Sequence, residues 1–216
     1  MKKIAVISAD VINSSIYDEV EYISSIDQLE QPAVNFLKKS GDLMLSSRGD
    51  SFQVMLLDWQ DAFLKTIYLK SYFKKKTARL KHNTTRKAID VRISLSVGYV
   101  GSIPLDIGKA MDEPFVLSGR ALDQMKSKDQ SFIITTNNDA INKELALNCA
   151  FLQHILDGWT VAQAEVIYYL VQGYKQVEIA EKLELSQPSV SNRIQLSNWV
   201  LIEKMNNRFV ELMDSL

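Results

Sequence analysis

Two short apolar runs joined by a four-residue turn constrain the fold of this chain more than any other feature. Residues 43–47 and 52–57 have the composition of β-strands, and the segment 48–51 between them contains Gly49. This arrangement predicts a β-hairpin with a glycine in its turn. Because strands joined by so short a turn run antiparallel, a purely parallel sheet is excluded.

Strands and helices alternate along the first 157 residues. The strongest strand pattern begins at Ile89, where every second residue up to Val97 is apolar. Pro32 is expected to begin a second helix within the segment 17–39. The resulting order, β-α-α-β-β-α-β-α-β-α, predicts an α+β sandwich with a mixed or antiparallel sheet. The other expected elements are strands at 4–9 and 132–135 and helices at 17–39, 59–80, 115–125 and 139–156.

The strand pattern disappears after Gly158. Thr160 and Gln163 have the spacing of a capping box, which predicts a helix at 161–171 that ends before Gly173. Two more helices are expected, one at 176–183 and one that starts near Gln187 and continues past Trp199. We therefore expect an α+β domain at 1–145 and an all-α domain at 146–216.

The composition is that of a folded protein without a membrane-spanning segment. Hydrophobic residues make up 46% of the 216 residues, and a net charge of −1 argues against a polybasic nucleic-acid binder. The single cysteine, Cys149, excludes an intrachain disulfide and a cysteine-rich zinc site. The apolar run at 4–9 stops at Asp10, which favours the first strand of a cytoplasmic protein over a signal peptide.

Two carboxylates follow neighbouring strands of the expected sheet. Asp10 comes directly after the first strand, and Asp50 lies in the hairpin turn. If these strands pair, the two carboxylates meet at one edge, where Mg²⁺ or Mn²⁺ could bind between them together with a nucleotide. Backbone amides and hydroxyls of Asn13, Ser14 and Ser15 would then hold the phosphates. The alternative is that both aspartates only stabilise turns.

The same segments resemble a known enzyme fold. Asp10 after the first strand, the hairpin segment 47–54 and the strand segment 93–98 are similar to the palm-type, ferredoxin-like fold of class III nucleotidyl cyclases and GGDEF domains. This resemblance covers about residues 1–135 and implies that Asp10 and Asp50 are metal ligands. The hairpin reads Arg-Gly-Asp-Ser-Phe where the family has Gly-Gly-Asp-Glu-Phe, and no Asn-x-x-x-Arg pair follows Gly119. These departures favour a degenerate site without enzymatic activity.

The C-terminal segment resembles a DNA-binding motif. The residues from Trp159 to Ser191 are similar to the helix-turn-helix of LuxR-type regulators and of sigma-factor region four. In that arrangement Ile179, Ala180 and Val190 would face the core, and polar residues of the third helix would face base edges. The alternative is a helical bundle used for dimerisation. The residues expected to contact DNA are Lys175, Gln176, Gln187, Ser189, Ser191, Asn192 and Arg193.

The charge distribution predicts weak DNA binding by a single copy. Acidic residues outnumber basic ones after residue 145, although contacts to phosphates supply much of the binding energy. We therefore expect a homodimer, or help from the lysine-rich run at 65–92. That run is more simply interpreted as a solvated helix face. The apolar residues at 209–216 are expected either to form a dimer contact or to return onto the core.

The length and the combination of parts resemble the SatD family of bacterial proteins. Together these observations predict a cytoplasmic, DNA-binding transcriptional regulator whose degenerate cyclase-like domain binds a ligand or a partner. The alternative is a metal-dependent nucleotidyl cyclase, or another nucleotide-binding enzyme of phosphoryl transfer, with its site at Asp10 and Asp50.

Overall fold

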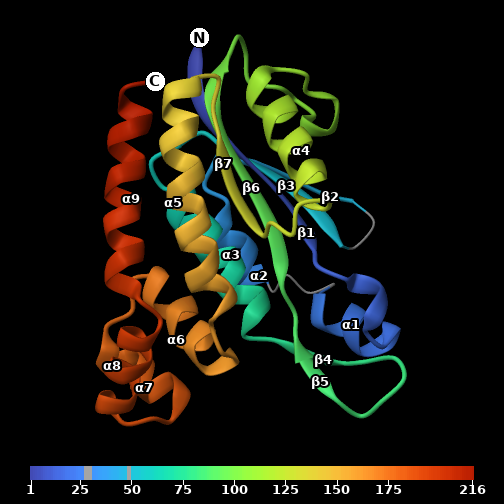
Figure 1. Cartoon of the computed structure of the whole chain (residues 1–216), viewed down its shortest axis with the longest axis vertical. Helices are drawn as coiled ribbons and strands as arrows, with labels where there is room; N and C mark the ends of the chain where they lie inside the picture. The colour runs from blue at the N-terminus through green and yellow to red at the C-terminus, as the bar shows by residue number, and fades with distance from the viewer. Residues whose placement is uncertain (27–30, 48–49) are drawn as a thin grey trace.

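A mixed β-sheet forms the centre of the molecule (Figure 1). The computed structural model describes residues 1–26, 31–47 and 50–216. In this part of the chain the sheet has the strand order β2-β3-β1-β6-β7, in which β1 is antiparallel to both neighbours and β6 is parallel to β7. The strands are β1 (Lys2–Val11), β2 (Leu43–Ser47), β3 (Ser51–Leu56), β6 (Val91–Val100) and β7 (Phe132–Thr135).

The order of strands in the sheet is that of a ferredoxin-like fold with one strand added. Strands β1, β2, β3 and β6 with the intervening helices make a β-α-β-β-α-β unit, and β7 extends its edge. The prediction of an α+β fold with a mixed sheet is confirmed. The helices of this part are α1 (Glu19–Ile26), α2 (Gln31–Leu37), α3 (Ala62–Lys74), α4 (Glu113–Met125) and α5 (Asp139–Asp157), with short 3-10 helices at η1 (Ser14–Ile16) and η2 (Ile107–Lys109).

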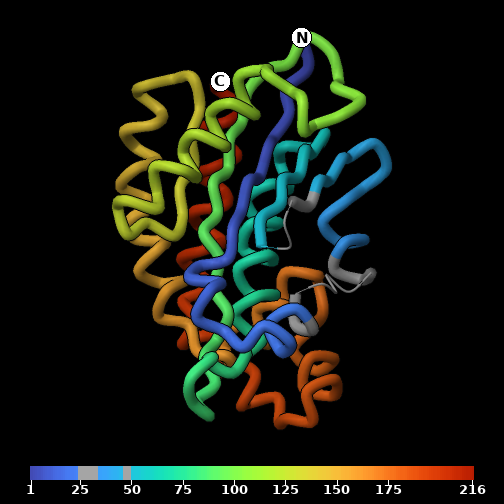
Figure 2. Tube along the Cα trace, turned by 90° about the vertical axis from the view of Figure 1, so that its right-hand side faces the viewer, coloured from blue at the N-terminus to red at the C-terminus, as the bar shows by residue number. Residues whose placement is uncertain are grey.

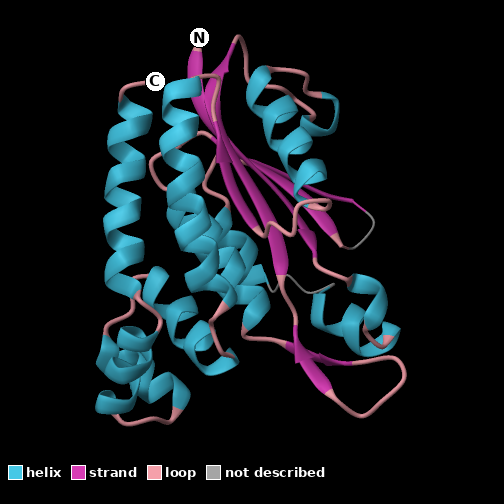
Figure 3. Ribbon diagram, in the orientation of Figure 1, coloured by secondary structure: helices cyan, strands magenta, loops and turns pink. Residues whose placement is uncertain are grey.

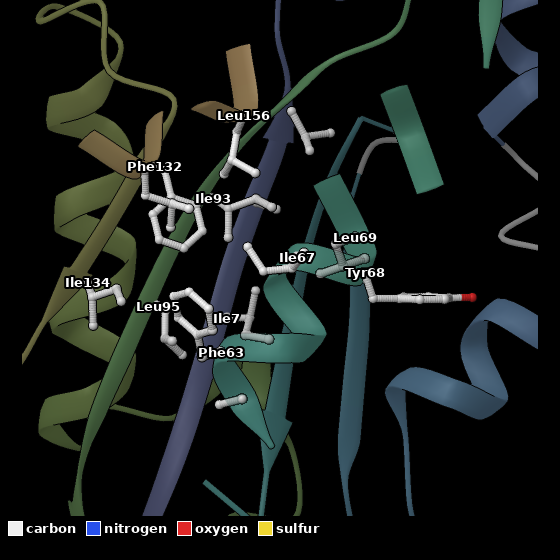
Figure 4. Close-up of a cluster of buried hydrophobic side chains, with 14 of the residues drawn as sticks. Ile7, Phe63, Ile67, Tyr68, Leu69, Ile93, Leu95, Phe132, Ile134 and Leu156 are labelled. Atoms are coloured by element: carbon white, nitrogen blue, oxygen red, sulfur yellow. The ribbon is translucent and has the colours of Figure 1, made fainter. Parts of the chain in front are cut away.

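The main core lies between one face of the sheet and helices α3 and α5. Figure 4 shows Ile7, Ile93 and Leu95 of the sheet pointing toward Phe63 and Ile67 of α3. These side chains are fully buried, as expected for strands whose alternate residues are apolar. Burial of each such side chain contributes roughly 1.5–3 kcal/mol.

The opposite face of the sheet carries α4 and changes character along its length. At one end Ile4, Val6 and Met55 pack against Phe115 of α4. Toward the other end the side chains on this face are polar, beginning at Ser8. This polar half of the face holds the candidate site.

The C-terminal helices share the hydrophobic core of this body through residues of α6 and α9. These helices are α6 (Val161–Val171), α7 (Gln176–Leu183), α8 (Gln187–Leu196) and α9 (Trp199–Asp214). The rings of Tyr68 in α3 and Tyr168 in α6 lie 5.1 Å apart, and the ring of Phe209 in α9 lies 5.8 Å from that of Phe63. The expected boundary between residues 145 and 146 falls within the continuous helix α5.

The end of the chain returns to its beginning. Helix α9 runs back along the body, so that both termini lie at the same end of the molecule (Figure 2). The Lys3 ammonium group donates a hydrogen bond to the carbonyl oxygen of Met213 at 2.6 Å. Phe209 and Met213 are buried. Of the two predictions for the apolar tail, its return onto the core is therefore confirmed.

Two expected helices have different bounds in the structure. The helix expected at 59–80 ends at Lys74, because residues Thr77–Arg79 (β4) pair with Arg86–Ala88 (β5) in a hairpin beside the main sheet (Figure 3). The helix expected to continue past Trp199 is broken at Asn198, which has a left-handed backbone with φ of 57°. Asparagine tolerates this conformation better than most residues do.

The interpretation of the run at 65–92 as a solvated helix face was wrong. Lys65, Lys70 and Lys74 of α3 are buried, because this helix is covered by the sheet and by α6. Their ammonium groups reach carboxylates at the rim of the core. Lys65 lies 3.5 Å from Asp42, and Lys70 lies 2.7 Å from Asp90. These lysines are therefore not available to bind phosphates.

Candidate functional site

The polar end of the sheet brings Asp10 of β1 beside Asp50, the residue that precedes β3. Asp10 of β1 pairs with Ser51 of β3 on one side and with Arg92 of β6 on the other. The Val11 N–H donates a hydrogen bond to the carbonyl oxygen of Asp50 at 2.8 Å. The backbones of Asp10 and Asp50 therefore adjoin, but their carboxylates have different partners.

The Asp10 carboxylate is held by two cationic side chains. The Arg92 guanidinium donates to one oxygen at 2.9 Å and to the other at 3.4 Å. The Lys126 ammonium group, at the end of α4, lies 3.4 Å from the second oxygen. Asp10 is only 8% exposed, so these charges interact with little screening by water. Arg92 and Lys126 were not among the predicted site residues.

The Asp50 carboxylate lies beside hydroxyl groups. The Ser14 hydroxyl donates to it at 3.2 Å. The Tyr22 hydroxyl of α1 is buried, and it finds no hydrogen-bond partner among the described residues. Burial raises the pKa of Tyr22 far above its usual value, and the negative charge of Asp50 raises it further.

A tight turn follows β1 and lies next to this pair of aspartates. Asn13 has a left-handed backbone with φ of 53°, and its carbonyl oxygen accepts a hydrogen bond from the Ile16 N–H at 3.0 Å. Asn13 and Ser15 are exposed, and Ser14 is partly buried against Asp50. The three residues predicted to hold phosphates therefore lie at the mouth of the site, where backbone N–H groups of such a turn could meet an anion.

A cleft of about 500 Å³ lies on the same face of the sheet, between α4 and strands β1 and β3. Two of its polar lining residues contact each other, because the Gln53 side chain donates to the Ser8 hydroxyl at 3.0 Å. The Ser8 hydroxyl also lies 2.9 Å from the buried Ser118 hydroxyl. Arg120 is among its lining residues. The cleft extends to Ser51, the backbone partner of Asp10.

The donor set at this edge does not fit a divalent cation well. Among the described residues, no three histidine, cysteine, aspartate or glutamate side chains are grouped as metal ligands. Mg²⁺ prefers carboxylate oxygens together with substrate phosphates. Both oxygens of Asp10 instead face cations that the chain supplies.

The second predicted site lies on α7 and α8. Ile179, Ala180 and Val190 are buried together, and the Leu185 N–H donates to the Ala180 carbonyl oxygen at 2.9 Å across the turn. Glu184 in this turn has a left-handed backbone with φ of 52°. Of the seven residues predicted to contact DNA, Lys175, Gln187, Ser191 and Asn192 are exposed and Gln176, Ser189 and Arg193 are partly buried.

Arg193 is directed toward the protein's own surface. Its guanidinium lies 3.9 Å from the Glu165 carboxylate of α6, and its side chain is 25% exposed. Gln187, Ser191 and Asn192 carry no such restraint among the described contacts. The exposed polar row of α8 therefore consists of uncharged side chains.

Comparison with known proteins gives structural similarity only. No protein-family model matches the chain, and no curated protein matches it. The active GGEEF domain of a diguanylate cyclase from Vibrio cholerae is similar over 64% of this chain and 85% of that one, with 14% identity and a TM-score of 0.45. The GGDEF domain of DgcB from Caulobacter crescentus, in complex with c-di-GMP, is similar over 62% and 77%, with 9% identity and a TM-score of 0.39.

A third similar structure is the diguanylate cyclase SiaD from Pseudomonas aeruginosa, in complex with its activator SiaC. It matches 62% of this chain and 50% of its own, with 11% identity and a TM-score of 0.41. The likeness to these three structures concerns only the arrangement of strands and helices in part of the chain. None of the helices in the described residues has the length and apolar character needed to cross a bilayer.

Proposed function

We propose that the protein is a DNA-binding transcriptional regulator whose cyclase-like part binds a ligand or a partner without catalysis. The observation that supports this best is the geometry of α7 and α8. Their apolar residues pack inward around Val190, and Gln187, Ser191 and Asn192 form an exposed polar row along α8. A recognition helix presents such a row to the major groove.

The chemistry of this row suits base edges. Asparagine and glutamine can make paired hydrogen bonds with adenine, and arginine can do so with guanine. Arg193 would first have to leave Glu165, which lies 3.9 Å away. We therefore expect Gln187 and Asn192 to carry most of the sequence preference, and Arg193 to contribute only after this ion pair opens.

The charge around α7 limits affinity for DNA. Glu178, Glu181 and Glu184 are exposed near the proposed recognition helix, and each would repel phosphates. Two copies acting on one operator would double the number of base contacts without requiring a basic surface. We therefore propose that the protein binds DNA as a homodimer.

Selection of bound sequences from random DNA by the full-length protein tests the proposal. Recovery of a common motif at moderate salt is expected, with strong loss of binding in Gln187→Ala and Asn192→Ala. Gln124→Ala, at an exposed position of α4, is the matched control and should bind like the unaltered protein. Failure to recover any motif, or equal binding by all variants, would reject the proposal.

The second candidate function is phosphoryl transfer at Asp10 and Asp50. It is favoured by the adjoining backbones of these residues and by the turn at Asn13, Ser14 and Ser15, where nucleotide phosphates would bind. Incubation with nucleoside triphosphates and Mg²⁺ or Mn²⁺ tests it. A product that disappears in Asp50→Ala would support this function, and the absence of any product would leave ligand binding as the role of the domain.

A further inference from the structure

We infer that Arg92 and Lys126 replace a divalent cation at Asp10, so that this edge of the sheet binds no Mg²⁺ or Mn²⁺. The inference does not depend on DNA binding by α8. It concerns only the charges around β1. Asp10 is then one member of an ion cluster with Arg92 and Lys126, and it is not a metal ligand.

The first cation is fixed by the register of the sheet. Arg92 lies directly opposite Asp10 on the neighbouring strand β6. Its guanidinium contacts both carboxylate oxygens, at 2.9 and 3.4 Å. A planar guanidinium suits such a two-point contact with a carboxylate. Because both residues belong to central strands, this contact is pre-organised by the backbone.

The second cation comes from a different element. Lys126 is the C-cap residue of α4, and its ammonium group lies 3.4 Å from the Asp10 oxygen that Arg92 contacts less closely. The carbonyl end of a helix favours a positive charge. Lys126 is thus held near Asp10 by both the carboxylate and the helix terminus. Its side chain is 51% exposed, so it is the more easily displaced of the two cations.

The Asp10 carboxylate has two cationic partners without a metal ion. Lys126 also lies 3.7 Å from the exposed Asp123 carboxylate, whereas the contacts of Arg92 at this edge are to Asp10. A divalent cation would approach a carboxylate that already has two positive groups within hydrogen-bonding or ion-pairing distance. These positive groups repel a divalent cation, and the low exposure of Asp10 leaves the repulsion only partly screened by water. Each of the two cations therefore weakens metal binding at Asp10.

Removal of the two cations should therefore create the metal site that the wild-type chain lacks. The experiment measures Mn²⁺ binding to the full-length protein by electron paramagnetic resonance and by calorimetry. We compare the wild type, Arg92→Ala/Lys126→Ala, and the same double variant with Asp10→Asn added. Lys109→Ala removes an exposed lysine that is paired with Asp106, and it serves as the control for loss of positive charge.

The expected result is no specific Mn²⁺ binding by the wild type or by the control. The double variant should bind Mn²⁺ at least about tenfold more tightly than the wild type, and addition of Asp10→Asn should abolish this gain. Specific binding by the wild type that is lost in Asp10→Asn would overturn the inference.

A double variant that folds but binds Mn²⁺ no more tightly than the wild type would also overturn it. If the double variant does not fold, Lys126→Gln alone should give a smaller gain, and its absence would also overturn the inference.

Discussion

The ammonium group of Lys74 in α3 donates a hydrogen bond to the carbonyl oxygen of Leu156 in the last turn of α5, at 2.7 Å. A second bond, at 2.8 Å, reaches the carbonyl oxygen of Asp157, and the Asp90 carboxylate lies 3.3 Å away. Carbonyl groups at the end of a helix lack partners within the helix. Lys74 supplies one, and it thereby fixes the point from which the chain continues into α6.

Replacement of Lys74 tests this connection. Lys74→Met keeps most of the apolar stem but removes the donor and the charge. The Asp157 carbonyl oxygen and the Asp90 carboxylate lose this partner, and the Leu156 carbonyl oxygen keeps the Gly158 and Trp159 backbone N–H groups. The free energy of unfolding in urea should fall by on the order of 3 kcal/mol. Lys109→Met, at an exposed position, should change it by less than about 0.5 kcal/mol. Equal effects of the two substitutions would contradict the structural role of Lys74.

The pH dependence of stability should carry the signature of the same residue. Burial lowers the pKa of Lys74 below its ordinary value of 10.5, although the charge of Asp90 partly opposes this effect. Between the lowered pKa and 10.5 the unfolded chain binds more protons than the folded chain, so this residue makes stability rise with pH. The difference in unfolding free energy between the wild type and Lys74→Met should therefore grow as pH rises toward 10.5. A constant difference across a urea-denaturation series would contradict this prediction.

The shared core predicts one unfolding transition for the whole chain. Phe209 of α9 is 1% exposed and packs against Phe63. Phe209→Ala should reduce stability by about 3–5 kcal/mol. It should lower the melting temperature seen by sheet and helix signals alike. Val200→Ala, at a side chain that is 61% exposed, is the control. Loss of the α9 signal alone would show that the helical part unfolds independently.

In the turn between α7 and α8, Glu184 has a strained backbone conformation that a substitution can relieve. Glu184 is left-handed, which costs a residue with a side chain about 1–2 kcal/mol. Glu184→Gly should stabilise the protein by roughly 0.5–1 kcal/mol. This net gain is smaller than the strain removed, because glycine loses more backbone entropy on folding than glutamate does. If α8 binds DNA, the substitution should also tighten binding by removing a negative charge. Glu184→Gln separates the two effects, because it changes the charge but not the backbone preference.

Cys149 should be unreactive in the folded protein. Its thiol is 3% exposed within α5, and burial raises its pKa to about 12. Alkylation depends on the thiolate, so iodoacetamide should leave the native protein unmodified at neutral pH. Mass spectrometry before and after unfolding in urea measures this. Rapid modification of the native chain would mean that α5 opens away from the sheet.

Strands and helices that are marked by a pattern of neighbouring residues could be predicted from the sequence. The alternation from Ile89 to Val97 gave strand β6, and the spacing of Thr160 and Gln163 gave the start of α6, where the capping box is present. The break at Asn198 was missed because asparagine can also continue a helix and no glycine or proline marks the position. Hairpin β4–β5 was missed because its strands have only three residues each.

The candidate site depended on contacts between distant residues. The sequence predicted Asp10 just after the first strand and Asp50 in the hairpin turn. In the structure β1 extends through Asp10, and its pairing with β3 brings the backbones of Asp10 and Asp50 together. Arg92 could be placed on the polar side of its strand by alternation alone. Its contact with Asp10 depends on the register between β1 and β6. The two residues are 82 positions apart in the sequence, and no local pattern predicts the register of strands that far apart. The buried lysines of α3 were misjudged for the same reason.

The connection between α5 and α6 consists of only Gly158, Trp159 and Thr160. The Trp159 indole N–H donates to the carbonyl oxygen of Ser197, just after α8, at 3.0 Å. This short connection and this hydrogen bond hold α8 in a fixed position relative to the sheet. In a pair of copies, the contact between the two bodies alone would set the separation of the two α8 helices, and with it the spacing of the half-sites that they could read.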